Sequence, residues 1–178
     1  MNRLVIVAAL LAASCSLGGD LKESFYVLSG PEGAPPAASG DALVIFVGPV
    51  AVPESVDRSQ MVLQNSANQV DLPEEHRWAE PLKTAIPRVV AEHLTRLLGT
   101  PRVMSSRLGT SVDLDYRVAL EVQRFESSLR DGAAVDVLWT LTGKRVPGGR
   151  SGRSSVREAT SVPTPQGVAA AHSRALAR

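Results

Sequence analysis

The sequence of 178 residues contains one cysteine and three histidines. A single cysteine excludes an internal disulfide. His76, His93 and His172 lie far apart, and none belongs to a metal-binding spacing such as H-E-x-x-H. The serine nucleophile motif G-x-S-x-G is also missing, although a triad that only the fold assembles leaves no spacing to find. We therefore expect a protein that is not an enzyme, with no catalytic residues, no cofactor and no metal site.

Long apolar runs are also scarce, and the one that exists lies at the amino end. Leu4–Ala13 is about half as long as the roughly 20 residues of a membrane-spanning helix, and no second such run follows. Arg3 precedes the run, and small residues at positions 12–14 end it, which is the arrangement of an export signal. We predict that residues 1–14 are a signal peptide and that the chain does not span a bilayer.

Cys15 directly follows the small residues, and this placement resembles the bacterial lipobox, in which the thiol is acylated and becomes the new amino end. An ordinary cleaved signal with a cysteine there by chance is the alternative. At about 0.8 kcal/mol per buried methylene, two or three acyl chains would hold the protein at a membrane. Ser16 resembles the residue that favours sorting to the outer membrane. Residues 15–24 are polar and contain glycine, which predicts a flexible lipid tether.

The remaining chain is long enough for one domain with a real core, which we place at residues 25–178. Lys and Arg number 19 and Asp and Glu number 18, so net charge gives no reason to expect nucleic acid as a partner. Basic residues dominate from Lys144 onward. They indicate either a solvated loop or a surface for anionic headgroups or an acidic partner.

Hydrophobic periodicity predicts the secondary structure. Apolar or alternating runs predict strands at residues 25–28, 42–53, 115–125 and 133–143, a weak hairpin around residues 65–68, and a polar edge strand at 152–161. An apolar stripe with a spacing of three and four residues predicts the main helix, which begins near Pro81 and ends at Gly99. A shorter helix follows Thr164. We expect an α/β (α+β) fold in which a mixed, largely antiparallel sheet packs against these two helices.

The least ordinary segment is "VGPVAVPESVDRSQMV" (47–62), followed at short distance by "HRWAEPL" (76–82). Asp57 and Arg58, and Arg77 with Glu80, offer ion pairs, while Trp78 offers a large apolar anchor. The segment is either a partner-binding surface or a structural corner that docks the helix on the sheet. The candidate residues are Pro49, Pro53, Asp57, Arg58, Gln60, Arg77, Trp78 and Glu80.

These two stretches resemble the ABC-type transport auxiliary lipoprotein family (PqiC-like). The resemblance continues through "DYRVALEVQRFE", "VLWTL" and the late "AHSRALA", so it covers nearly all of the mature chain. It implies a lipid-anchored α/β domain at the periplasmic face of the outer membrane. It also implies partners, namely an MCE-domain protein or an ABC transporter or permease that moves lipid between membranes, and in some members a homo-oligomeric ring. The alternative is an orphan lipoprotein that binds a ligand or scaffolds the envelope.

Overall fold

The computed structural model describes residues 22–33, 43–105 and 113–178. The predicted signal peptide, Cys15 and most of the predicted tether lie outside the described residues, so these expectations remain predictions.

Three long strands form an antiparallel meander on one side of the main sheet. They are β7 (Tyr116–Ser128), β8 (Gly132–Thr142) and β9 (Arg150–Glu158), in agreement with the alternating sequence pattern. Gly132 begins β8 with a φ of 91°, and a Cβ at this position would lie 2.1 Å from the carbonyl oxygen of Glu158. Only glycine fits this turn without strain. Among the described strands, β9 pairs only with β8, and it is the edge strand that its polarity predicted.

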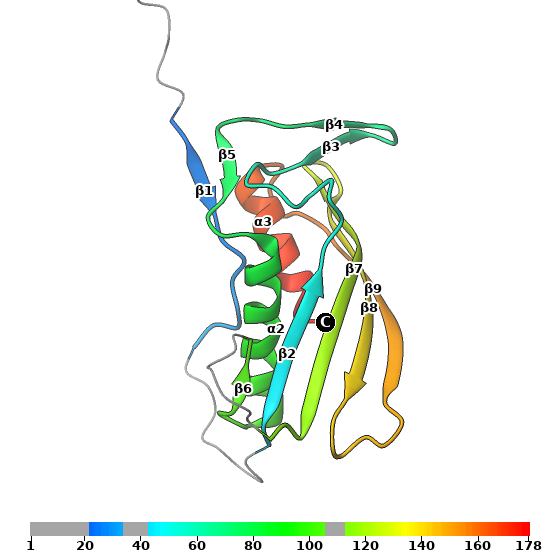
Figure 1. Ribbon diagram of the computed structural model, residues 1–178. Helices are drawn as coiled ribbons and strands as arrows, with labels where there is room; N and C mark the ends of the chain where they lie inside the picture. Colours follow the sequence, from blue (N-terminus) through cyan, green and yellow to red (C-terminus); the bar gives the residue numbers. More distant parts are fainter. Residues whose placement is uncertain (1–21, 34–42, 106–112) are drawn as a thin grey trace, which may run out of the picture.

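On its other side, β7 pairs with two further strands, one after the other along its length. β2 (Ile45–Ala51) runs parallel to the first half of β7, with Ile45 opposite Tyr116, and β6 (Val103–Met104) pairs with β2. β3 (Leu63–Ser66) meets β7 only near its far end, and forms the expected short hairpin with β4 (Gln69–Asp71). The result is a seven-stranded mixed sheet that is mostly antiparallel (Figure 1).

A second, two-stranded sheet lies apart from the first. β1 (Ser24–Tyr26) pairs in parallel with β5 (His76–Trp78), which places Tyr26 opposite Trp78. The pairing joins the amino end of the described chain to the segment that precedes the main helix.

The two helices lie where the sequence predicted them. α2 (Leu82–Leu98) follows Pro81, which is the N-cap residue, and ends at Gly99, whose φ of 60° is the left-handed conformation typical of a helix C-cap. The helix runs through Pro87 as one element. α3 (Pro165–Ala175) begins with a cap in which the Thr164 hydroxyl accepts a hydrogen bond from the Gly167 amide at 3.1 Å.

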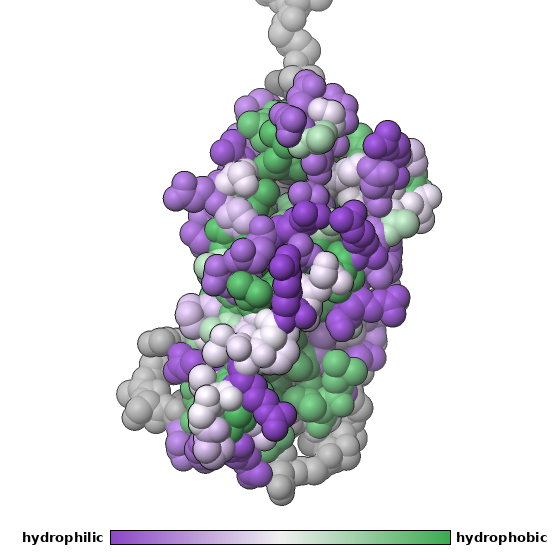
Figure 2. All heavy atoms as spheres, turned by 90° about the vertical axis from the view of Figure 1, so that its right-hand side faces the viewer, coloured by the Kyte–Doolittle hydropathy of each residue, from purple (hydrophilic) through white to green (hydrophobic). Residues whose placement is uncertain are grey.

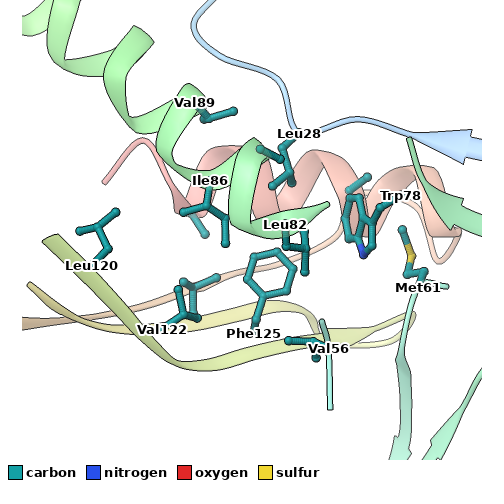
Figure 3. Packing of buried hydrophobic residues seen from close by; sticks show 14 of the residues in the cluster. Leu28, Val56, Met61, Trp78, Leu82, Ile86, Val89, Leu120, Val122 and Phe125 are labelled. Atoms are coloured by element: carbon teal, nitrogen blue, oxygen red, sulfur yellow. The ribbon is translucent and has the colours of Figure 1, made fainter. Parts of the chain in front are cut away.

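The core forms where α2 and α3 pack against the sheet. Figure 3 shows Leu82 and Ile86 of α2 facing Val122 and Phe125 of β7. The buried residues of β7 alternate as Leu120 and Val122 and then as Phe125 and Ser127, with one extra residue where the register with β8 shifts between Val122 and Arg124. The fold is therefore α+β, with one main helix and a shorter C-terminal helix, as the sequence predicted.

Candidate functional site

The segment from Pro49 to Gln60 connects β2 to β3 and carries five of the eight candidate residues. The Gly48–Pro49 peptide bond is cis, and the register between β2 and β7 shifts between Val47 and Val50. The β2–β7 ladder is therefore irregular around this proline, and β2 continues to Ala51. Beyond it, the Pro53 carbonyl accepts hydrogen bonds from the amides of Val56 and Asp57, at 3.0 and 3.1 Å. Pro53 thus starts a compact turn, and Figure 3 shows its Val56 beside Phe125 of β7.

The end of this segment is fastened to β5. The Trp78 amide donates to the Ser59 carbonyl at 2.7 Å, and Gln60 forms an isolated antiparallel bridge with Arg77. The Gln60 side chain also donates to the Glu74 carboxylate at 3.3 Å. Backbone pairing therefore holds Gln60 beside Arg77 and Trp78, where the turn meets β5.

Asp57 and Arg58 have different surroundings although they are adjacent. Asp57 forms an ion pair with Lys83 of α2 at 2.5 Å. Arg58 is exposed, and no carboxylate of the described residues lies within ion-pair distance of it. The aspartate ties the turn to the helix, whereas the arginine presents an uncompensated positive charge to solvent.

The expected pairing of Arg77 with Glu80 is wrong. Arg77 contacts Glu23 and Glu74, both at 3.3 Å, and Glu80 contacts Arg88 of α2. The reason is that the chain turns between the two residues, because Arg77 lies in β5 whereas Glu80 lies just before α2. The hydrogen bonds that Arg88 donates to the Glu80 carboxylate are the largest cause that raises the pKa of Arg88 above its ordinary value.

Trp78 lies at the centre of a buried aromatic cluster. Its ring makes edge-to-face contacts with Phe125 and His172, at centroid distances of 6.1 and 6.0 Å. The His172 ring stacks on Phe125 at 3.8 Å, with 9° between the planes. The cluster joins β5, β7 and α3, so the expected anchoring role of Trp78 includes the last helix.

A serine–histidine pair lies within this cluster, and the sequence analysis did not find it. Ser127 Oγ and His172 Nε2 are 2.8 Å apart, and both residues are buried. Burial lowers the pKa of His172 from its ordinary 6.5 to about 3, so the ring is neutral. His172 Nδ1 has no hydrogen-bond partner in the described part of the chain, so no third group orients the ring there as a triad would require. The geometry fits core packing.

Two open grooves flank the β3–β4 hairpin. One, of about 550 Å³, lies between the turn at 53–58, the hairpin and β7. Its apolar wall includes Val70 and Leu72, which are 52% and 42% exposed, and Arg58 stands at its side. The other groove, of about 640 Å³, lies between the hairpin and the turn that joins β7 to β8, and arginines and aspartates line it.

The edge strand β9 presents polar and basic side chains. Figure 2 shows the side of the molecule on which β9 lies, with hydrophilic side chains over much of it. Asp136 of β8 is nearly buried and accepts hydrogen bonds from Ser155 and Arg153. The Ser155 hydroxyl, followed by Arg153, holds the pKa of Asp136 below its ordinary value.

Neither a metal centre nor a membrane span is found in the ranges that the structure describes. No group of three or more histidine, cysteine, aspartate or glutamate side chains in these ranges is arranged to hold an ion. None of the helices described here has the length and apolar character needed to cross a membrane.

Comparison with known proteins identifies the family. Residues 26–178 match the model of the ABC-type transport auxiliary lipoprotein component. No curated protein matches the sequence. Two solved structures share the fold at low identity. The first is described only as an uncharacterized protein: it has a TM-score of 0.69 and 17% identity over 88% of this chain and 92% of that one. The second is protein XCC0632 from Xanthomonas campestris, with a TM-score of 0.67 and 18% identity over 86% of this chain and 88% of that one. Because the family model spans almost the entire described structure, the chain belongs to the ABC-type transport auxiliary lipoprotein component family.

Proposed function

We propose that this protein is a non-enzymatic accessory lipoprotein of an MCE/ABC-type system that transports lipid between the two membranes of the envelope. The observation that carries the proposal is the family match over residues 26–178. The lipobox-like sequence around Cys15 supports a lipid anchor, and Ser16 supports a location at the periplasmic face of the outer membrane. The transported molecule would then pass through the partners, while this protein holds them at the membrane.

The protein would act through surface contacts. The partner is an MCE-domain protein or an ABC transporter or permease of the same system, and the protein itself assembles into a homo-oligomeric ring. Two features support such contacts: the open edge of β9 and the turn that presents Arg58. A strand that pairs on one side only leaves backbone groups free for another chain.

The test is crosslinking in intact cells that express the full-length protein, followed by capture through a C-terminal tag. We expect an MCE-domain protein or permease to be recovered, and its recovery to be lost with Cys15→Ser. Recovery of this protein alone, while a known envelope complex survives the same treatment, would contradict the proposal and favour the orphan lipoprotein.

The role of the 49–60 segment is tested in the same assay. Replacing Asp57 and Arg58 should weaken capture, and circular dichroism should show that the fold is intact. Unchanged capture with both residues replaced would remove the segment from the proposed contact surface.

A further inference from the structure

β7 is paired continuously along one edge but not along the other. β2 follows it as far as Glu121, which lies opposite Ala51, and β3 meets it again only at Ser127, opposite Leu63. The five residues Val122–Glu126 between these points have β8 on one side and no ladder partner in the described chain on the other. Figure 1 shows β2 ending part-way along β7 while the chain departs toward β5 and the hairpin.

The backbone of this stretch has hydrogen-bonding groups to offer. In a strand that pairs on one side, alternate residues direct their N–H and C=O groups to the other side. No backbone hydrogen bond among the described residues joins Val122–Glu126 to the connecting segment 52–62. The register with β8 also shifts between Val122 and Arg124, so the strand is irregular at this point.

The groove of about 550 Å³ lies along this unpaired edge. β7 residues 123–127 form one wall of the groove, and the turn at 53–58 and the hairpin form the others. The exposed apolar side chains Val70 and Leu72 overhang it. An extended segment of five residues, about 17 Å long, matches the length of the unpaired stretch.

Charge indicates what such a segment would carry. Arg124 and Glu126 both line the groove, and their side chains approach to 3.5 Å. Arg124 also lies 3.6 Å from Asp136 of β8, so its positive charge is compensated. Asp57 is held by Lys83 outside the groove lining. Among the described residues that line the groove, Arg58 is the charged side chain that has no carboxylate within ion-pair distance.

From this arrangement, we infer that the groove binds an extended peptide segment of a partner protein, which adds a short strand to β7 at Val122–Glu126. The segment has alternating apolar side chains, which contact Val70 and Leu72, and one carboxylate, which pairs with Arg58. The inference rests on the proposed function only in that the partner belongs to the transport system.

A peptide selection tests the inference without any assumption about that partner. The full-length lipoprotein in detergent is used to select from a displayed library of random heptapeptides. We expect enrichment of peptides with alternating apolar residues and one Asp or Glu. In a binding assay with the best peptide, Arg58→Glu should weaken affinity at least about fivefold, because it replaces attraction by repulsion. Arg150→Glu, the same charge change on the edge strand β9, is the matched control and should have little effect.

The mode of binding is read from backbone measurements. Hydrogen exchange should show that the peptide protects amides within Val122–Glu126, and methylation of alternate peptide nitrogens should abolish binding. No enrichment, no preference for acidic residues, equal losses in the two arginine variants, or protection elsewhere on the sheet would each overturn the inference. If the peptide binds as described but the cell capture recovers no transport protein, peptide binding in the groove is supported and the proposed function is refuted. If capture succeeds and is unaffected by Arg58→Glu, the proposed function is supported and the role of the groove in partner binding is refuted.

Discussion

The buried His172 predicts a specific dependence of stability on pH. Its pKa of about 3 in the fold, against an ordinary value of 6.5, arises from burial. Protonating the ring therefore costs roughly 5 kcal/mol more in the folded than in the unfolded protein. Between these two pKa values the unfolded chain binds the extra proton and the folded chain does not, so stability falls as the pH is lowered. From about pH 7.5 to pH 5 we expect the free energy of unfolding to fall by about 2 kcal/mol from this residue alone.

The assay is denaturant unfolding of a chain that starts after Cys15, at several pH values above 5. This window avoids the titration of Asp136 and Glu158, whose pKa values are lowered by their hydrogen-bonded partners. His172→Leu should abolish the part of the pH dependence that comes from this ring. The pKa of His93 is also lowered, chiefly by burial, so a smaller dependence of the same sign remains in the variant. Ser127→Ala keeps the ring buried and should lower stability by about 1 to 3 kcal/mol while preserving most of the pH dependence. An unchanged pH dependence in His172→Leu would refute the reasoning.

Three further predictions concern stability and are measured by the same unfolding assay. Gly132→Ala should destabilise the protein by more than about 2 kcal/mol, because the added Cβ would clash with backbone atoms. Gly148→Ala should cost only about 1 kcal/mol, because Gly148 has a positive φ but open space around it. Equal losses in the two variants would contradict the role of the clash. Trp78→Ala should cost about 3 to 5 kcal/mol because the ring is buried between three elements, and a loss under 1 kcal/mol would show that the cluster adds little. Asp57→Asn should cost less than about 1 kcal/mol, because its ion pair with Lys83 is partly exposed, so a larger loss would mean that the turn depends on that pair.

The sequence predicted the elements whose signals are local. The alternation in β7 and β8 and the helix that ends at Gly99 are both patterns within one stretch of chain, and the structure confirms them. The edge position of β9 could be predicted because polarity on both faces is incompatible with the centre of a sheet.

Local sequence patterns could not predict which distant segments pair with each other. The parallel ladders of β2 with β7 and of β1 with β5 join residues about 50 to 70 positions apart, and periodicity does not record which strands meet. The same limit explains the wrong pairing of Arg77 with Glu80, since proximity in sequence suggested a contact that the turn before α2 prevents. The contact between Ser127 and His172 depends on how α3 docks, which no local pattern contains.

α3 follows β1 to β9 and α2 in the sequence, yet its His172 belongs to the aromatic cluster with Trp78 and Phe125. The partners of this ring, on β5 and β7, are synthesised earlier and lack this contact until α3 emerges. A nascent chain that stalls before residue 165 would therefore expose Trp78 and Phe125 to other chains and to proteases. Synthesis of α3, more than that of any earlier element, therefore decides when these two rings become covered.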